Sequence, residues 1–308
     1  MGLTAGILRI LGALVVLGIL GILGAFPLEA EAKSYNLFGL LSEADVDAEL
    51  AARWTESTSF PERIEKASRG LIGAPYVLSP LGEGKAGRVD TDPRFRLDAF
   101  DCTTFVETAL ALTRCRDLQN AKSFLDKIRY LDDRQTFADR RHFMTSQWIP
   151  GLIADGLLED VTQEVGEHET QDVALVLTPQ RWRRRRVARS ISLPSERIPA
   201  GTFRLPFVPI SSVLNRLSRV PPGTIVNIVR ADSPGTFDVI THQGLVLSHR
   251  EGIRVVRHAS PVSKRVIDES LEHMVRRYLR PRRWPIVGMN FLRIRPGDCN
   301  LARPPQGP

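Results

Sequence analysis

Cysteine and histidine are scarce in this chain of 308 residues, which contains three cysteines and six histidines. The cysteines are Cys102, Cys115 and Cys299, and neither they nor the histidines recur at the short spacings of zinc sites. The sequence also lacks internal repeats. We therefore expect no metal centre and no repeat architecture.

The N-terminal segment is apolar from Ile7 to Phe26 except for Arg9, and small residues follow it. This pattern is typical of a signal peptide, although the run is also just long enough to span a bilayer. Residues 1–32 are therefore expected to be a signal peptide or an N-terminal membrane anchor, with the rest of the chain exported. No cysteine lies near the cleavage region, which argues against a lipoprotein anchor.

Positive charge exceeds negative charge, with a formal net charge of +7. Removal of residues 1–32 takes away Arg9, Glu29 and Glu31 and raises this value to +8. Such a balance favours anionic partners. No nucleic-acid reader module accompanies the basic residues, so nucleic acid is not an expected partner.

Two arginine clusters are prominent, one at residues 181–186 and one at residues 276–283. We place the first in a basic surface insertion around residues 178–200. Each cluster is either a solvated charged surface or a patch that binds an anionic polymer or lipid.

Helical patterns dominate the first half of the chain and strand patterns the second, an α+β arrangement. One domain is expected over residues 33–298, followed by a disordered tail at residues 299–308. Helices are predicted at residues 42–54, 61–70 and 121–131, and strands at residues 173–177, 224–229, 239–247, 253–258 and 289–294.

Cys102 follows an aspartate at the start of a further amphipathic helix, in which apolar residues recur at helical spacing. Asp101 is the expected N-cap. The helix dipole and unpaired backbone N–H groups of the first turn favour the thiolate, so Cys102 is a candidate nucleophile. The alternative is a small buried core thiol.

Two histidines strengthen the catalytic interpretation. His242 lies within a strand of β-branched residues, and His258 ends the next predicted strand. A hairpin between these strands would let one ring hydrogen-bond the other. Chain order then gives a nucleophile, a base and a residue that orients the base.

The segments around these three residues, FDCTTFVETALAL, THQGLVL and VVRHAS, resemble the motifs of NlpC-type papain-like cell-wall hydrolases. More narrowly they resemble the N-acetylmuramoyl-L-alanine amidase-like family. The stretches Gly70–Tyr76, Arg140–Phe143 with Trp148, and Leu205–Pro209 also fit the family's order. One departure is Gln243, where the family usually has valine.

The resemblance implies a papain-like α+β fold, with the nucleophile helix packed on an antiparallel sheet. It implies that Cys102 attacks an amide, that His242 transfers the proton and that His258 orients His242. Tyr76 and the Cys102 backbone N–H would bind the oxyanion. Water would then hydrolyse the thioester, and no cofactor is needed.

The resemblance also places His142 and Trp148 at the substrate cleft, where the indole would stack on a sugar. Without it, they read as a surface histidine and a core tryptophan. Glu107, one turn beyond Cys102, is expected to face solvent or the cleft and to be stabilised by the helix dipole.

The expected substrate is peptidoglycan or released muropeptides, in a bacterial periplasm or cell envelope. The narrower resemblance implies cleavage between N-acetylmuramic acid and L-alanine. Alternatives are cleavage between γ-D-glutamate and a diamino acid, acyl transfer, or wall binding without catalysis. A disulfide between Cys115 and Cys299 is possible but is not decided by the sequence. Cys102 and Cys115 would lie roughly 20 Å apart on one helix, which is too far for a disulfide.

Overall fold

The structure, a computed structural model, describes residues 36–183, 193–249, 252–280 and 284–299. The predicted signal peptide or anchor at residues 1–32 lies outside these ranges, as do residues 184–186 of the first arginine cluster and the tail at residues 300–308. Within the described ranges, no helix is both long enough and apolar enough to cross a membrane.

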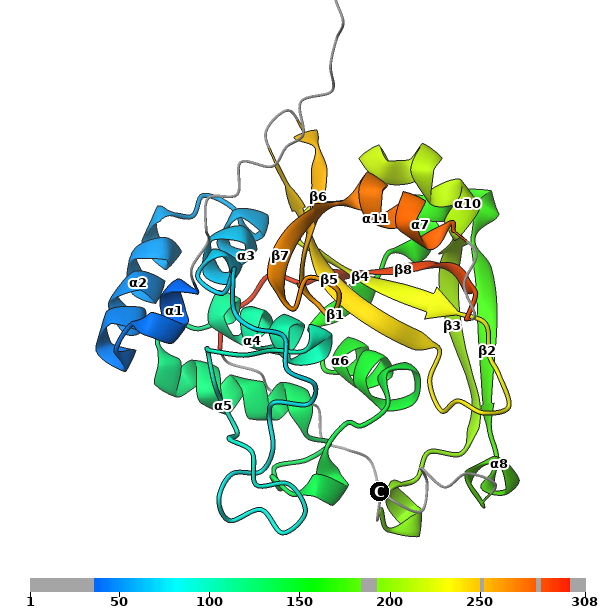
Figure 1. Cartoon of the computed structure of the whole chain (residues 1–308), viewed down its shortest axis with the longest axis horizontal. Coiled ribbons are helices and arrows are strands. Elements are labelled where there is room, and N and C mark those ends of the chain that lie inside the picture. The colour runs from blue at the N-terminus through cyan, green and yellow to red at the C-terminus, as the bar shows by residue number, and fades with distance from the viewer. Residues whose placement is uncertain (1–35, 184–192, 250–251, 281–283, 300–308) are drawn as a thin grey trace, which may run out of the picture. The chain divides into compact units, whose positions relative to one another are not determined.

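An eight-stranded sheet forms the centre of the fold (Figure 1), and every strand pair in it is antiparallel. Its order is β2-β3-β8-β4-β5-β6-β7, with β1 paired to β8. The strands are β1 (Leu158–Asp160), β2 (Gln171–Leu177), β3 (Gly201–Pro209), β4 (Thr224–Arg230), β5 (Ile240–Ser248), β6 (Arg254–Ser260), β7 (Arg265–Ser270) and β8 (Ile286–Ile294).

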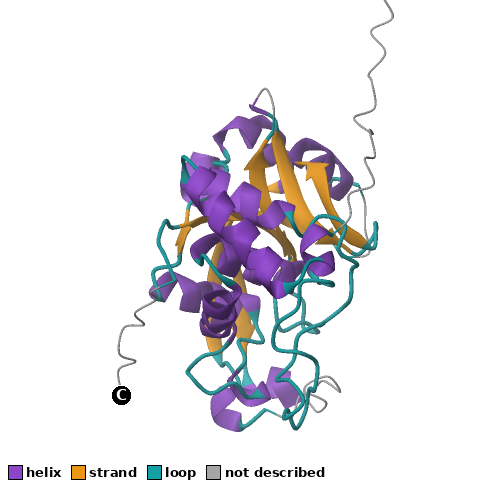
Figure 2. Ribbon diagram, turned by 90° about the vertical axis from the view of Figure 1, so that its left-hand side faces the viewer, coloured by secondary structure: helices purple, strands orange, loops and turns teal. Residues whose placement is uncertain are grey.

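Helices cover both faces of the sheet, and Figure 2 shows those of the N-terminal half in front of the strands. The described helices are α1 (Leu37–Leu40), α2 (Glu43–Glu56), α3 (Phe60–Arg69), α4 (Cys102–Arg114), α5 (Leu118–Arg129), α6 (Ile149–Ala154), α7 (Thr162–Gly166), α8 (Pro179–Arg183), α10 (Ile210–Val213) and α11 (Leu271–Tyr278). A π-helix at Met144–Trp148 leads into α6.

Strand β4 explains how two cores form on one sheet. Its side chains alternate between faces, so Ile225 and Val229 join the core beneath α3–α6, whereas Val226 and Ile228 join the core beneath α10 and α11. Because both faces are covered, apolar residues occupy successive positions. This continuous pattern is why a strand could be predicted here from the sequence.

The helix that begins at Cys102 is held by the cap that its sequence predicts. Asp101 accepts a hydrogen bond from the Thr104 backbone N–H, and Thr104 Oγ1 accepts one from the Asp101 N–H. The second carboxylate oxygen of Asp101 accepts from the Ser79 backbone N–H at 3.0 Å. Helix α4 then packs between α5, α3 and strands β5 and β6, which fixes its first turn against the sheet.

The far end of α4 is joined to the C-terminal segment by a Cys115–Cys299 disulfide, with the Cα atoms 5.1 Å apart. Arg114 adds hydrogen bonds to the backbone carbonyls of Arg295 and Asp298. The disulfide that the sequence left undecided is therefore present, and Cys102 is the free cysteine among the described residues. Cys299, placed in the tail by the sequence, is bonded to the core.

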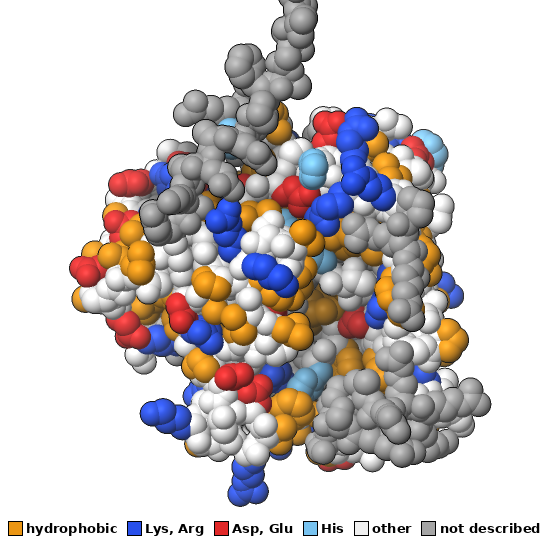
Figure 3. Space-filling model, in the orientation of Figure 1, with side chains coloured by type: hydrophobic (Ala, Val, Ile, Leu, Met, Phe, Trp, Pro, Cys, Tyr) orange, Lys and Arg blue, Asp and Glu red, His pale blue; other side chains and the backbone are white. Residues whose placement is uncertain are grey.

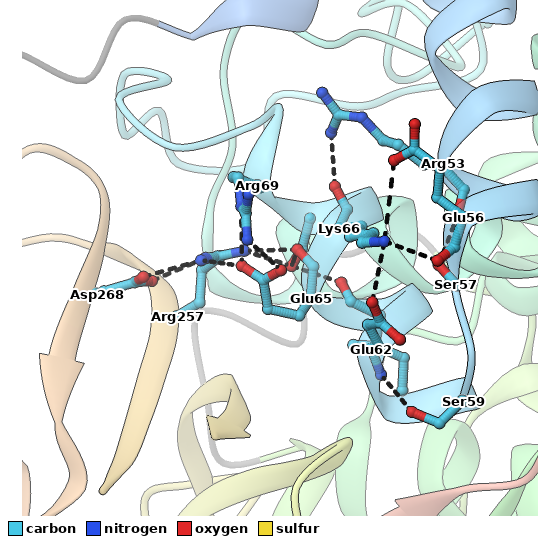
Figure 4. Close-up of polar contacts among 12 residues, drawn as sticks. Arg53, Glu56, Ser57, Ser59, Glu62, Glu65, Lys66, Arg69, Arg257 and Asp268 are labelled. Atoms are coloured by element: carbon cyan, nitrogen blue, oxygen red, sulfur yellow. Dashed lines mark hydrogen bonds and ion pairs between the residues drawn. The ribbon is translucent and has the colours of Figure 1, made fainter. Parts of the chain in front are cut away.

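Polar contacts join α3 to the sheet (Figure 4). Arg257 of β6 is only 3% exposed and pairs with Asp268 of β7 at 2.8 Å. Its guanidinium also donates to the Glu65 carbonyl and to Ser68 Oγ of α3, both at 2.9 Å. A buried guanidinium with this many partners fixes the angle at which α3 crosses β6.

Among the described residues of the arginine clusters, Arg181 and Arg277 are held by contacts within the fold, whereas Arg276 is 64% exposed at its side chain. Residues 282 and 283 of the second cluster lie outside the described ranges. Arg181 hydrogen-bonds Asp232 and the carbonyls of Ser233 and Thr236, and the neighbouring Trp182 stacks on Phe237 with ring centroids 4.0 Å apart. In the second cluster, Arg276 pairs with Glu272 and Arg277 with Glu269. On the face seen in Figure 3, Lys and Arg side chains form separate groups with acidic and neutral surface between them.

Candidate active site

The two histidines lie where strands β5 and β6 separate. These strands pair only over Leu245–Ser248 of β5, so the preceding residues of β5 pair with β4 alone. Across this opening, His242 Nε2 lies 2.7 Å from His258 Nδ1, with the rings nearly perpendicular at 84°. Both rings are buried. The hairpin thus brings the two predicted histidines into one hydrogen bond.

Two residues that the sequence did not suggest continue this contact. Glu269 Oε2 lies 3.2 Å from His258 Nε2, and Arg277 contacts both oxygens of the same carboxylate, at 3.0 and 2.7 Å. Burial opposes the change, but the contact with His258 and the hydrogen bonds from Arg277 outweigh it and lower the pKa of Glu269 to about 2. A carboxylate is therefore present behind the histidine pair at neutral pH.

The register of β6 and β7 explains why Glu269 reaches His258. His258 faces Ile267 in this pairing and Val256 faces Glu269, so Glu269 is the diagonal neighbour of His258 on the same face. The sequence analysis did not identify β7. The segment Arg265–Ser270 has two adjacent apolar residues followed by three polar ones, so it gives no alternating signal that could have placed Glu269.

Cys102 approaches β5 from the first turn of α4. The backbone N–H of Gln243, the residue after His242, hydrogen-bonds the Cys102 sulfur. Among the described contacts, none joins this sulfur to the His242 ring. The thiol is therefore placed against the residue that follows the base, and catalytic hydrogen bonds are often absent before a substrate binds.

The prediction of a thiolate-favouring site at Cys102 is wrong for the unliganded protein. Burial, with a smaller contribution from the Asp101 carboxylate, raises the pKa of the thiol to about 11. Hydrogen bonds from Gln243 and Thr103 oppose this rise but do not cancel it. Removal of the thiol from water thus outweighs the helix dipole.

The imidazole of His242 is correspondingly uncharged. Burial, followed by the nearby His258 and Arg277, lowers its pKa to about 3. At neutral pH the site therefore holds a neutral thiol and a neutral base, and proton transfer must accompany attack.

Tyr76 lies close enough to Cys102 for the two groups to influence each other. Burial and the neighbouring Cys102 and Asp101 raise the pKa of its hydroxyl, which stays protonated and able to donate. Its segment is held between Phe100, which precedes the nucleophile helix, and the Lys264 carbonyl of the β6–β7 turn. The Cys102 backbone N–H, at the start of α4, has no acceptor within the helix.

A cavity of about 420 Å³ opens beside the histidines, on the α11 side of the sheet. Both histidine rings line it, but Cys102 and Tyr76 do not. Its remaining lining combines cationic and aromatic side chains, which are Arg230, Arg277, Tyr278 and Trp284, with the turn after β6. Trp284 is 51% exposed. A ligand in this cavity would meet the base directly.

Trp148 does not fit the predicted role of a sugar-stacking residue, because its side chain is fully buried. Its Nε1–H donates to Glu107 Oε1 at 2.8 Å. Glu107 is therefore not a solvent-facing charge at a helix start: it is 4% exposed and lies 3.5 Å from Arg129. Burial raises the pKa of its carboxyl to about 7.

His142 is half-buried rather than a surface residue. Its Nε2 lies 2.6 Å from the Phe137 carbonyl, and its ring packs against Phe137 and Phe143. Burial lowers its pKa to about 4. The residue is absent from the lining of the cavity beside the histidines, and its predicted role in substrate binding stays a prediction.

Gln243 takes part in a buried polar network under the site. Its amide donates to Asn227 Oδ1 at 2.7 Å, and Asn227 donates to Asn290 Oδ1 at 2.9 Å. Asn290 in turn contacts Asp160 and Thr162. The side chain of Gln243 thus has a partner on β4 and is linked through it to Asn290 of β8. Within the described ranges, no group of three metal-ligating side chains occurs.

The fold and site together describe an α+β protein with a cysteine and two histidines at the junction of helix and sheet. Over residues 66–279 the chain matches the family model described as AmiA-like, N-acetylmuramoyl-L-alanine amidase-like. The chain belongs to this amidase-like family. No curated protein sequence gave a match.

Solved structures share the fold at low sequence identity. A DUF1460 protein from Legionella pneumophila strain Philadelphia 1 matches with a TM-score of 0.69 and 24% identity, covering 83% of this chain and 96% of its own. An N-acetylmuramoyl-L-alanine amidase from Bacteroides uniformis matches with a TM-score of 0.59 and 21% identity, covering 77% and 99%. These similarities establish a common fold.

Proposed function

We propose that the protein is a cysteine amidase that hydrolyses the amide between N-acetylmuramic acid and L-alanine in peptidoglycan or released muropeptides. The observation that carries this proposal is the 2.7 Å contact between His242 and His258, next to the residue whose backbone meets the Cys102 sulfur. Membership of the amidase-like family supports the choice of the amide that is cleaved. A papain-like, NlpC-type scaffold is part of the same proposal.

In this mechanism the Cys102 sulfur attacks the amide carbonyl while its proton moves to His242. Tyr76 and the Cys102 backbone N–H donate to the oxyanion. The C–N bond then breaks, His242 returns the proton to the leaving amine, and a thioester remains. Water attacks the thioester with His242 as base, which releases the acid and restores the thiol.

The position of the base assigns the two halves of the substrate. Because His242 protonates the leaving amine, the released peptide must begin beside this ring. The cavity lined by His242, Arg230 and Arg277 lies there, and its cationic lining suits the carboxylates of a stem peptide. The acyl half, which carries the sugar, would then lie on the side of Cys102 and Tyr76.

Export to a bacterial periplasm or cell envelope is part of the proposal. The apolar segment at residues 7–26 supports export, as does the Cys115–Cys299 disulfide, because such bonds persist mainly in oxidising compartments. Peptidoglycan is present in this compartment.

The test is mass spectrometry of soluble muropeptides, including anhydro-muramyl forms, after incubation with the protein or with Cys102→Ala. We expect peptide beginning with L-alanine and peptide-free sugar, from the unaltered protein alone. A cut inside the stem would reassign the protein as a γ-D-glutamyl-diamino acid endopeptidase. Unchanged fragments from a folded protein with a reduced thiol would contradict hydrolysis and favour wall binding or acyl transfer.

A further inference from the structure

Behind the histidine pair lies a carboxylate for which the proposed mechanism has no step. Glu269, at the end of β7, is 12% exposed at its side chain and contacts His258 at 3.2 Å. A carboxylate held this close to an imidazole restricts where the imidazole carries its proton.

An ionised carboxylate only accepts hydrogen bonds, so its position 3.2 Å from His258 Nε2 favours a hydrogen on that nitrogen. With this single hydrogen on the ring, Nδ1 of His258 keeps a lone pair. This nitrogen faces His242 Nε2 at 2.7 Å, so His242 Nε2 must be the donor. The proton of a neutral His242 is thereby placed on Nε2, and its lone pair on Nδ1.

The opposite tautomer of a singly protonated His258 is disfavoured by repulsion. A proton on His258 Nδ1 would turn the Nε2 lone pair toward the Glu269 oxygen, at 3.2 Å. Two lone pairs at that distance in a buried site repel each other without screening by water.

Arg277 holds the carboxylate in its charged form and in place. Its guanidinium contacts both oxygens of Glu269, at 3.0 and 2.7 Å. The same guanidinium lies over the ring of Tyr278, with its carbon 4.7 Å from the ring centroid. A bidentate pair fixes the plane of the carboxylate as well as its charge. His273 also approaches Glu269, at 3.8 Å, but is largely exposed.

We propose that Glu269, held by Arg277, is a positioning residue that sets the tautomers of His258 and His242 and presents His242 Nδ1 as the base. The role rests on the proposed function, because only a catalytic His242 needs a defined lone pair. His258 relays the constraint, and Glu269 itself touches no substrate.

The first test is the tautomeric state of the unaltered protein, measured by long-range ¹H–¹⁵N correlation of the histidine rings. Signals of His242 and His258 would be assigned by comparison with His242→Ala and His258→Gln. We expect hydrogen on Nε2 and a lone pair on Nδ1 in both rings. Hydrogen on His242 Nδ1 would overturn the proposal, and this measurement needs no variant at Glu269 to fold.

The second test is Glu269→Gln, which keeps the shape but allows the amide either to donate to or to accept from His258. We expect mixed tautomers at His242 and a kcat lower by about tenfold to a hundredfold, with KM little changed. The matched control is Glu272→Gln, because Glu272 is half-exposed and pairs only with Arg276 at 2.7 Å among its described ion pairs. A Glu269→Gln protein with wild-type kcat and unchanged tautomers would contradict the proposal.

The two proposals fail in different ways. If the tautomers are as expected but no muropeptide is cleaved, the proposed function fails while the role of Glu269 as a tautomer-setting residue stands. If muropeptides are cleaved and Glu269→Gln changes neither tautomer nor kcat, the role of Glu269 fails alone.

Discussion

The Cys115–Cys299 disulfide allows the largest stability effect to be worked out from the structure. The bond closes a loop with a sequence separation of 184 residues. In the chain-entropy model, closing a loop of this length destabilises the unfolded chain by about 5 kcal/mol at 25 °C. Replacing Cys299 by alanine removes the bond and leaves a small buried thiol at position 115.

The native structure should tolerate this change. Arg114 still donates to the carbonyls of Arg295 and Asp298, so the C-terminal segment keeps its place on α4. We therefore expect Cys299→Ala to reduce the free energy of unfolding by about 3–5 kcal/mol. The corresponding fall in Tm is on the order of 10 °C for a domain of this size.

Denaturant titration followed by circular dichroism, without reductant, measures this difference. The matched control is Cys102→Ala, which removes a thiol without opening the loop and should cost far less. The unaltered protein unfolded and refolded in reductant should match Cys299→Ala. Equal stability of the oxidised protein and Cys299→Ala would refute the loop-closure reasoning.

Two further predictions concern Trp148 and His142, which the resemblance places at the substrate cleft. Trp148→Phe removes the indole donor to Glu107, so we expect a loss of about 1–3 kcal/mol in stability and no change in KM for muropeptides. A raised KM at unchanged stability would return Trp148 to the substrate cleft. Burial lowers the pKa of His142 from 6.5 to about 4. As pH falls, the unfolded chain therefore takes up this proton at a higher pH than the folded chain does. The free energy of unfolding consequently falls as pH drops from 6.5 to about 4. Replacement by glutamine should reduce the acid-induced loss between pH 7 and 4.5 by at most about 3 kcal/mol, and denaturant titrations at both pH values check it; equal losses in both proteins would count against the assignment.

Local signals in the sequence were sufficient for the elements that carry the nucleophile and the histidines. Asp101 precedes an apolar helical pattern and caps α4 as predicted, and the β-branched run around His242 forms β5. These elements have cores on one or both sides, so their patterns are strong. The short and mixed pattern of β7 was missed, and Glu269 with it.

Burial of polar groups was harder to predict, because it depends on partners far away in the chain. Glu107 looks like an exposed charge until Trp148 and Arg129 are placed around it. From the sequence, the helix should activate the thiol of Cys102, but its burial, which raises its pKa, is apparent only in the structure. The disulfide partner of Cys115 lies 184 residues away, and no local pattern indicates that the two approach.

The uncharged resting state of the thiol and imidazole has a consequence for the survival of the protein. Oxidants and alkylating reagents attack the thiolate, and a pKa of about 11 leaves only about one molecule in ten thousand in that form at neutral pH. An idle Cys102 would thus resist the oxidising surroundings that keep the Cys115–Cys299 bond closed. Reactivity would appear only while a bound amide is aligned for attack, so chemical durability and selectivity would arise from the same burial.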